Sequence, residues 1–568
     1  MNRPMDPDLH RAVALVVEGK PMMRNITSNH LRAAGIEQVT SCGSLDEARL
    51  LLERNVYDIV VCSLDFEGSL LSGQDLLEEL RREQLLPHRT VFLIVTDQAT
   101  YARVTEAAES SLDGLIVQPF SGATLTDRLL EARSRKRLLS DVIVALEAGE
   151  LEVALARAVK RFQERHRYWN YCARLSAELL LRLNRPDDAA KLFQRVLDIQ
   201  PEGWARVGLV RADIAAGRTL QARKGLEVLV KEDPQNADAQ DLLGRLRVER
   251  AEFTQAMDSY RAAAELTPGC LLRAQHAGAL AFHLGRHDEA LRLLKRARAL
   301  GGRSRLFDCL SLFLMALIQF DTGDRDGMDS SVDELRVFAR RHSRSVRLAR
   351  LSAAGETLRQ IRSGEVEIAR QRLIAQGGAR LDEDFDAEAA QLLLGLWSRL
   401  PPALAECDER NRFIREAALR FCTSRSAAEV LIVAAGHNDQ ATHIIKQALA
   451  TVNTAAENAL QQALEGASGQ DGANGESGGS GAAVAAETLL KTARQTRNSR
   501  LIAMVPGLAQ ECQAAMGVEK AQAISEEARE LMSRYRPTSI HIAGILRSGR
   551  SPGGLVIRSG ADRGQDPS

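Results

Sequence analysis

Residues 243–268 read LGRLRVERAEFTQAMDSYRAAAELTP, two amphipathic segments joined by a turn at Ala251, with Ala256 five positions later. The same arrangement, a Gly or small turn residue followed by Ala at the fifth position, recurs at steps of 33 to 35 residues. A period near 34 predicts an all-α solenoid in which each unit is a pair of helices. The recurring pairs are Gly149/Ala154, Asn184/Ala189, Gly217/Ala222, Ala251/Ala256 and Gly285/Ala290.

These repeats resemble the tetratricopeptide (TPR) family. Small alanines let two antiparallel helices approach closely, a turn glycine permits a left-handed helix end, and a proline starts the next unit. We expect TPR repeats over residues 140–302 and degenerate TPR-like helical repeats over residues 303–464. The positions that match the family pattern are Leu243, Gly244, Ala256, Tyr260, Ala263 and Pro268 in one repeat, and Ala189, Phe193 and Pro201 in another.

The first 139 residues show a different pattern, in which short apolar runs alternate with amphipathic segments. This alternation predicts a parallel sheet with helices on both faces and a ligand site at the carboxyl ends of the strands. The segment 125–148 has no clear helix breaker, so we expect the last helix to run close to the next domain. The expected strands are residues 12–17, 58–62, 90–95 and a short fifth strand at 115–117, and the expected helices are 22–34, 45–54, 74–84, 100–109 and 123–137.

Residues 11–139 resemble the receiver domain of bacterial response regulators. The resemblance rests on the strand 57–62 (YDIVVC), the helix 73–81 (GQDLLEELR), the strand 91–96 (VFLIVT) and the pair Pro119-Phe120. It implies a flavodoxin-like α/β domain with a five-stranded parallel sheet, here followed by the all-α TPR-like solenoid. The combination is similar to bacterial receiver–TPR response regulators.

In that family a phosphoryl group is transferred to an aspartate. The resemblance implies a carboxylate acceptor, a Mg²⁺ held by two acids after the first strand, a hydroxyl and a lysine. Glu18 keeps one metal-side acid, but Gly19 occupies the second position. Thr96 keeps the hydroxyl, whereas Gln118 replaces the lysine and Leu115 replaces the aromatic switch residue. A metal site at Glu18 is therefore expected to be weak and non-functional.

The acceptor position depends on the register of the third strand. Counting from Asp58, the usual family offset gives Ser63, whereas counting back from Gly73 gives a position near Asp65. A shift of two residues preserves the strand face, so periodicity leaves both readings open. We favour Ser63, because an insertion in the loop after the apolar strand costs little. The degenerate phosphorylation site then consists of Ser63, Asp65, Thr96 and Gln118.

By analogy with the TPR family, the first helix of each repeat contributes side chains to a partner-binding groove. Arginine beside Tyr, Trp and Phe is the composition of protein-binding hot spots. The alternative is that individual members of this set pack between repeats. Glu178 stands where chaperone-type TPR clamps need an amide, which argues against a terminal carboxylate as the ligand. The groove positions are Tyr171, Arg174, Arg182, Trp204, Arg211, Arg245 and Phe282.

Three histidines, His276, His283 and His287, lie near one inter-helix turn. Because His283 and His287 flank Gly285, they do not share a helical face as a zinc pair requires, and we expect solvated turn histidines. The chain also has no GxSxG, no P-loop and no GxGxxG in a strand context. The sequence therefore predicts no enzyme and no cofactor, with Mg²⁺ only if phosphotransfer is retained.

The C-terminal part divides by composition. We expect a Gly/Ser-rich flexible linker at residues 465–481, about three amphipathic helices over 482–535, and a disordered tail rich in Gly, Ser and Arg over 536–568. The eight cysteines form no CxxC, which favours buried reduced thiols.

The 75 basic and 75 acidic residues balance, whereas a nucleic-acid binder normally shows a basic excess. No apolar run approaches the roughly 18 residues that a membrane span needs. We therefore expect a cytoplasmic protein with protein partners, and with neither nucleic acid nor membrane as a partner. A homodimer is left open.

Taken together, the sequence predicts a non-enzymatic signalling adaptor. A phosphorylation-deficient receiver and a TPR groove would each bind proteins. One alternative is a working phosphorelay response regulator that is phosphorylated at Asp65. Another is a TPR assembly or co-chaperone scaffold whose receiver fold is only structural.

Overall fold

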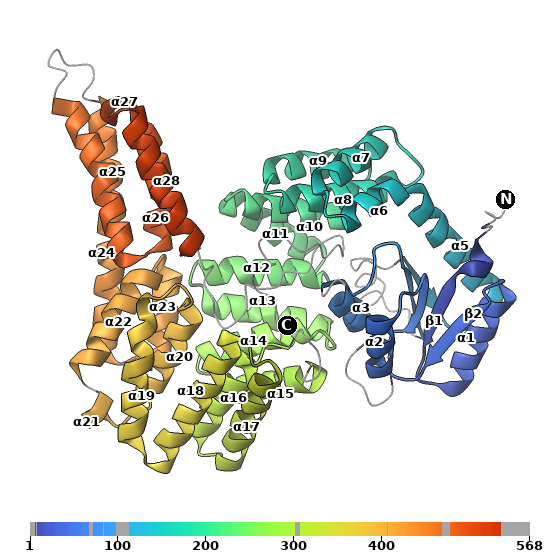
Figure 1. Ribbon diagram of the computed structural model, residues 1–568, viewed down its shortest axis with the longest axis horizontal. Helices are drawn as coiled ribbons and strands as arrows, with labels where there is room; N and C mark the ends of the chain where they lie inside the picture. The colour runs from blue at the N-terminus through green and yellow to red at the C-terminus, as the bar shows by residue number, and fades with distance from the viewer. Residues whose placement is uncertain are drawn as a thin grey trace.

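The structure is a computed structural model, and it describes residues 6, 8–66, 72–82, 85–97, 113–301, 307–405, 407–468 and 477–535. An α/β domain at the N-terminus is followed by a long helical array that curls back on itself (Figure 1). The α/β domain holds one five-stranded parallel sheet of order β2-β1-β3-β4-β5. Its strands are β1 (Val13–Val17), β2 (Gln38–Cys42), β3 (Ile59–Ser63), β4 (Val91–Thr96) and β5 (Gly114–Val117).

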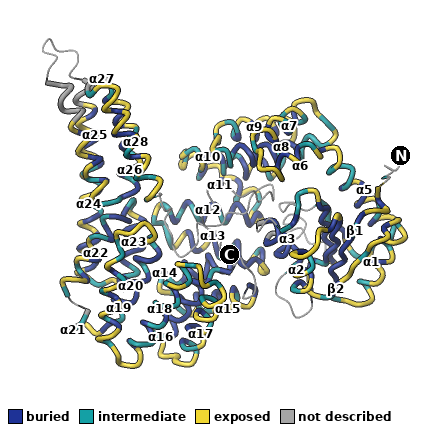
Figure 2. The backbone as a smooth tube through the Cα atoms, viewed as in Figure 1, coloured by how far each residue is buried: buried dark blue, intermediate teal, exposed yellow. Residues whose placement is uncertain are grey.

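Alternating strand residues build two cores, one on each face of the sheet. Leu15 and Val17 of β1 pack with Val60 on one side, whereas Ala14 and Val16 belong to the core of the other side. Because both faces are covered, the central strands are buried along their length, as Figure 2 shows for β1. The covering helices are α1 (Pro21–Ala33), α2 (Leu45–Arg54), α3 (Gly73–Arg82) and α5 (Gly122–Leu138), and a 3₁₀ turn at Leu9–Arg11 precedes β1.

The predicted flavodoxin-like fold class is confirmed, with one local difference. The runs recognised in the sequence did not include β2, because its residues QVTSC are mostly polar and exposed at the sheet edge. The last receiver helix runs close to the next domain, as expected, since α5 ends at Leu138 and α6 (Ser140–Glu147) begins after Leu139. The helix expected at residues 100–109 lies outside the described residues.

The predicted repeats form antiparallel helix pairs. Each of the five turn residues recognised in the sequence has a positive φ, between 56° and 77°, which ends one helix and redirects the chain. The helices are α7 (Leu151–Gln163), α8 (Trp169–Arg182), α9 (Pro186–Ile199), α10 (Gly203–Ala215), α11 (Thr219–Glu232), α12 (Ala237–Glu249), α13 (Phe253–Leu266), α14 (Leu271–His283) and α15 (His287–Gly301).

Helical pairs continue after residue 303, where the sequence repeat loses its phase. Gly323 and Gly364 again adopt positive φ between paired helices. The next helices are α16 (Leu310–Thr322), α17 (Arg325–Arg341), α18 (Val346–Ser363), α19 (Val366–Gly378), α20 (Ala387–Trp397), α21 (Pro402–Ala405), α22 (Asp408–Phe421) and α23 (Arg425–Ala434), with a 3₁₀ turn at Ala379–Leu381.

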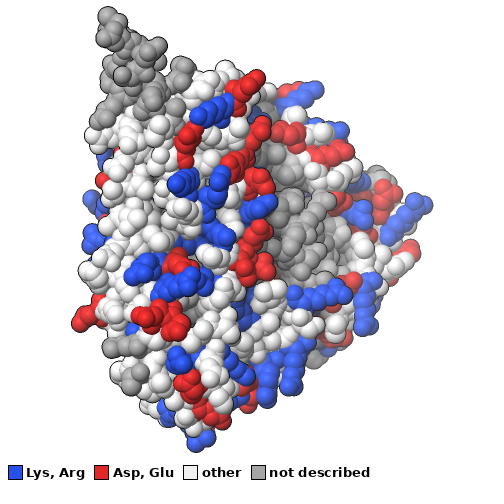
Figure 3. Space-filling model, turned by 60° about the vertical axis from the view of Figure 1, so that its left-hand side comes forward, with Lys and Arg blue, Asp and Glu red and all other residues white. Residues whose placement is uncertain are grey.

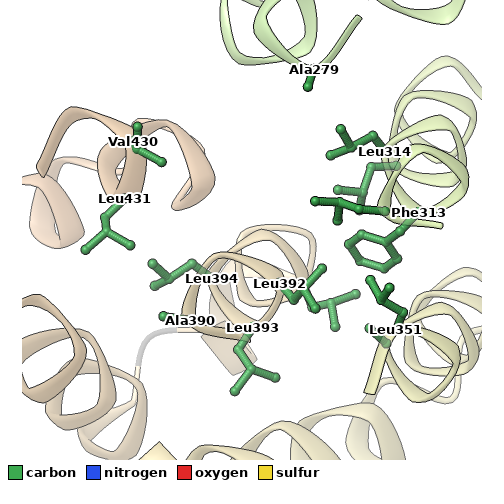
Figure 4. Close-up of a cluster of buried hydrophobic side chains, with 14 of the residues drawn as sticks. Ala279, Phe313, Leu314, Leu351, Ala390, Leu392, Leu393, Leu394, Val430 and Leu431 are labelled. Atoms are coloured by element: carbon green, nitrogen blue, oxygen red, sulfur yellow. The ribbon is translucent and has the colours of Figure 1, made fainter. Parts of the chain in front are cut away.

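The array curls until its later helices meet its middle. Ser426 Oγ on α23 donates a 2.6 Å hydrogen bond to the carbonyl of Val248 on α12, across 178 residues. One hydrophobic core runs through this region, and Figure 4 shows side chains of α14, α16, α18, α20 and α23 converging on it.

A projecting arm of helices follows α23 (Figure 1). Both ends of the predicted linker 465–481 are helical, which corrects that prediction, while residues 469–476 lie outside the described part. Helical structure extends into this Gly-rich stretch because the two long helices that flank it pack along each other, so tertiary contact overrides low propensity. The arm consists of α24 (Asp439–Ser468), α25 (Ser477–Thr496), α26 (Ser499–Glu511), α27 (Gln513–Met516) and α28 (Val518–Arg534).

The eight cysteines are all free thiols, and every one except the half-buried Cys407 is buried. Across the residues that the structure covers, no helix has the length and apolar character to cross a membrane. Positive and negative side chains interleave over the face shown in Figure 3, in keeping with the zero net charge.

Candidate functional site

The register of the sheet brings the predicted receiver positions to one edge. Ser63 is the last residue of β3 and pairs with Val95, one residue before Thr96. Thr96 in turn pairs with Val117, so Gln118 follows directly at the end of β5. These side chains, together with Glu18 after β1, therefore lie at the carboxyl edge of the sheet, where the ligand site of such folds is expected.

Local bonds hold these residues in place. Glu18 is buried, and its Oε1 accepts a 2.9 Å hydrogen bond from the backbone N–H of Lys20. Ser63 Oγ donates to the Asp65 carbonyl at 3.1 Å. The Gln118 N–H donates to the Thr96 carbonyl at 2.7 Å. Part of the hydrogen-bonding capacity of the site is thus used by its own loops.

Asp65 lies two residues beyond β3, and it is exposed on the following loop. The next helix starts tightly against the strand end. A Cβ at Gly73 would lie 2.7 Å from Cys62 Sγ and closer still to the Ser63 carbonyl oxygen. The strand therefore ends at Ser63, and the additional residues lie in the loop between Ser63 and Gly73.

The residues present do not fit the Mg²⁺ that the fold family implies. Gly19 supplies no ligand, and Glu18 already accepts a backbone N–H. Within the described ranges, no cluster of three or more His, Cys, Asp or Glu side chains could hold a metal ion. Mg²⁺ in such sites is held by carboxylates, and directly after β1 this chain offers only that of Glu18.

Three of the seven predicted groove residues, Arg174, Trp204 and Arg211, form contacts between neighbouring repeats. The Arg174 guanidinium lies 5.3 Å from the Trp204 ring centroid. Arg211 forms a buried ion pair with Asp238 at 3.7 Å, which joins α10 to α12. Two further arginines pair four residues along their own helices, Arg182 with Glu178 at 3.1 Å and Arg245 with Glu249 at 3.4 Å.

Tyr171 lies against the receiver instead of in an open groove, which corrects its assignment. The Arg135 guanidinium of α5 covers the Tyr171 ring at 5.1 Å from its centroid. Burial, aided by Asp113, raises the pKa of the Tyr171 phenol. The sequence could not show this contact, because Arg135 and Tyr171 meet only when the receiver packs on the first repeat.

Asp113 lies beside this contact between the receiver and the first repeat, and it binds Arg135. Its side chain is 2% exposed and accepts from Arg135 at 2.8 Å, lies 3.1 Å from Lys136 Nζ, and accepts from the Phe92 N–H at 2.9 Å. Although burial opposes its ionisation, the two cations and this backbone bond hold the pKa of Asp113 below its usual value. Glu147 of α6 accepts from the Arg89 N–H at 3.1 Å and adds a second link.

The expectation of solvated histidines is wrong for His276 and His283, which are both buried. The His283 ring stands edge-on to Phe253, with centroids 5.1 Å apart. Burial, with a contribution from His437, lowers the pKa of the His283 imidazole to about 4. Phe282, the remaining groove position, stacks on His287 and lines a cavity together with His283.

That cavity, of about 520 Å³, was not predicted from the sequence. It lies where α14, α16, α20 and α23 converge, so its lining comes from residues more than 150 positions apart. The only sequence signal for it was the pair Phe282 and His283 at the end of α14.

Comparison with known proteins places the N-terminal domain in a family. Residues 14–130 match the response regulator receiver domain, and residues 180–246 match a tetratricopeptide repeat. Chemotaxis protein CheY-3 of Vibrio cholerae is 33% identical over 115 residues, which cover 20% of this chain and 86% of that protein. The chain therefore belongs to the response-regulator receiver family, with TPR repeats behind the receiver.

Other relatives agree on the same domain. Chemotaxis protein CheY of Pseudomonas aeruginosa is 30% identical over 115 residues, 20% of this chain and 90% of that protein. Transcriptional activator protein PfeR of the same species is 33% identical over 127 residues, 22% of this chain and 39% of that protein. A solved structure of Naa15/Naa10 bound to HypK-THB has a TM-score of 0.27 at 13% identity, with 70% of this chain and 64% of that one covered.

Proposed function

We infer that this protein, a receiver joined to TPR repeats, acts in signalling and protein–protein interaction; both kinds of domain are typically non-enzymatic. We propose, more specifically, that this protein is a cytoplasmic signalling adaptor whose receiver has lost phosphotransfer and whose repeats bind a protein partner. The observation that supports the proposal is the carboxyl edge of the sheet, where Ser63 ends β3 and Gln118 follows β5. The family resemblance assigns Gly19, Ser63 and Gln118 to the metal, acceptor and lysine positions.

The chemistry of these three positions supports the proposed loss of phosphotransfer. A serine hydroxyl is a poor substitute for a carboxylate nucleophile, and a neutral amide cannot offset the charge that gathers on the phosphoryl oxygens. Without a second acid after β1, the divalent ion that would neutralise the same charge is also held weakly. The three losses reinforce one another, because each acts on the same transition state.

Incubation of the full-length protein with acetyl phosphate and Mg²⁺ tests the proposal. We expect the intact mass of the protein to be unchanged. We also expect beryllofluoride to leave the NMR signals of the receiver's backbone amides unchanged. The matched variant Gly19→Asp/Ser63→Asp/Gln118→Lys restores the missing groups, and it should gain the mass of one phosphoryl group under the same conditions.

A phosphoryl adduct on Asp65 of the natural protein would contradict the proposal and support the phosphorelay alternative. Asp65→Asn would then abolish the adduct. The co-chaperone alternative is separated by deleting residues 1–139, which should weaken partner binding if the receiver contributes, and should leave it unchanged if the receiver is only structural.

A further inference from the structure

The cavity inside the curl of the array has an apolar wall. Its lining includes Ala279, Leu314, Leu392 and Val430, which Figure 4 shows on four different helices. Its volume of about 520 Å³ is in the range of pockets that bind small molecules or a few side chains. A wall of this kind favours a ligand with an apolar body.

One buried polar atom of the lining lacks a partner. His283 is 8% exposed, and its Nε2 has no hydrogen-bond partner among the described residues. Such an orphaned buried nitrogen is costly, because its hydrogen bonds to water are lost without replacement, so native proteins seldom leave one unsatisfied. The nitrogen belongs to the lining of the cavity, which points to a bound group that can hydrogen-bond to it.

The charges of the lining favour a positively charged ligand. The lining holds three carboxylates, those of Asp321, Glu388 and Glu429, and one guanidinium, that of Arg399. Arg399 forms an ion pair with Asp321. Glu388 forms one at 2.7 Å with Arg347, which is not among the lining residues. Among the described residues, Glu429 is the lining carboxylate without an ion pair. The site is therefore complementary to an apolar group that carries a nearby positive charge.

A segment of this chain has that chemistry. Residues 536–550 read RPTSIHIAGILRSGR, in which the apolar run 540–546 is flanked by Arg536, Arg547 and Arg550. This segment lies beyond the described part and begins directly after Tyr535. The Tyr535 ring is fixed 5.2 Å from the Arg420 guanidinium at the end of α22, and α23, a wall of the cavity, follows α22 in the chain.

The segment also has a long reach from its anchor at Tyr535. Eleven residues separate Tyr535 from Leu546, and an extended chain of that length spans up to about 36 Å, several helix diameters. A segment tethered in this way acts at an effective concentration of about 1 mM.

We propose that residues 540–546 occupy this cavity as a ligand in cis, with their apolar side chains among Leu314, Leu392 and Val430 and Arg547 beside Glu429. The partner of the array would then have to displace the segment. This inference goes beyond the adaptor function, and it holds whether or not the receiver is phosphorylated.

Photocrosslinking in the full-length chain tests it. Phe282 is replaced by p-benzoylphenylalanine, a conservative change at the cavity wall, and the irradiated protein is digested and sequenced by mass spectrometry. We expect an intramolecular crosslink to residues 536–550. The same amino acid at Val228, an exposed position of α11, should give none to this segment. No crosslink from position 282, or a crosslink only to other segments or other proteins, would overturn the proposal.

A second variant tests the apolar run itself. Ile542→Asp/Ile545→Asp should lower the crosslink yield at least tenfold, because two carboxylates would enter an apolar, acidic cavity. The melting temperature should stay unchanged, which shows that the array remains folded. Ser551→Asp/Ser559→Asp adds the same charge outside the run and should retain the crosslink. Equal yields from the two double variants would overturn the proposal.

Discussion

Gly208 on α10 shows how a single small residue sets the distance between two helices. A Cβ at this position would lie 2.7 Å from Phe193 Cδ1, and closer still to two other atoms of that fully buried ring. Gly208→Ala should therefore destabilise α9 and α10 by about 1–3 kcal/mol through overpacking. Native-state hydrogen exchange measures this locally.

Gly203 on the same helix is the control for Gly208. No atom lies within 4 Å of a Cβ placed there, so Gly203→Ala should be neutral or stabilising by up to about 1 kcal/mol. Equal exchange rates in the two variants would show that α9 can move away from α10 at no cost.

His283 makes the stability of the array depend on pH. Its folded pKa of about 4 lies below the unfolded value of 6.5, so the unfolded chain binds more protons between these values. The contribution is complete above pH 6.5 and is lost as the pH falls, by up to about 2 kcal/mol at pH 5. We expect urea midpoints to fall between pH 6.5 and 5, and less steeply in His283→Phe.

The pH dependence of stability that remains in His283→Phe comes from other buried histidines. Burial also lowers the pKa of His276, and it lowers that of His88 to about 3, in the same direction. His443→Phe, at an exposed position of α24, removes an imidazole without changing a buried site. A variant slope that matches the wild-type slope would contradict a buried neutral His283.

At the scale of elements, Asp113 joins β4, β5 and α5 next to the first repeat. Asp113→Asn leaves Arg135 and Lys136 without their buried carboxylate, and loss of one partner of a buried pair costs about 3–5 kcal/mol. Since Arg135 also covers Tyr171, we expect faster hydrogen exchange both in β4 and at the start of α8.

Asp188 offers a matched control on the surface. It pairs with Arg185 at 2.9 Å, but both side chains are more than 40% exposed. Asp188→Asn should therefore change exchange rates little, since exposed ion pairs contribute little to stability. If Asp113→Asn altered β4 but left α8 unchanged, the receiver and the repeats would not be coupled through Arg135.

Element boundaries followed from the sequence where local chemistry alone sets them. The five turns between repeat helices were recognised from Gly, Asn or Ala at a fixed distance before an alanine, and all five adopt positive φ. Strand β2 and the ends of α24 and α25 were not recognised. The polar edge strand is held by pairing with β1, and the Gly-rich helix ends follow from packing, so neither leaves a local pattern.

For the whole molecule, Ser426 closes the curl by bonding to Val248. Ser426→Ala would remove one of the two donors to the Val248 carbonyl, which keeps its 3.0 Å bond from the Ala251 N–H, at a cost of about 0.5–1.5 kcal/mol. We expect faster exchange in both α23 and the end of α12. Ser533→Ala removes an exposed bond within one helix and should change stability by no more than about 0.5 kcal/mol. Exchange that rises in α23 alone would argue against closure through this contact.

Some residues of the candidate site could be placed from the sequence, and others could not. Ser63, Thr96 and Gln118 could be placed at one edge because parallel strands end together, and the register of β3, β4 and β5 has this arrangement. The groove arginines could not be interpreted from sequence, because whether Arg211 faces a partner or Asp238 depends on how neighbouring repeats pack. The substitutions at the phosphotransfer positions are visible in the sequence, but their effect on phosphotransfer remains a prediction.

The amino-acid sequence by itself determined the two kinds of domain and the turns between repeat helices, because strand alternation, helical period and turn residues act over a few positions. Only the tertiary structure decided that Tyr171 lies against the receiver, that His283 is buried, and that α23 returns to α12 around a cavity. The physical reason is distance along the chain. A solenoid adds a small rotation at each repeat, and only the sum of these rotations sets which distant surfaces meet.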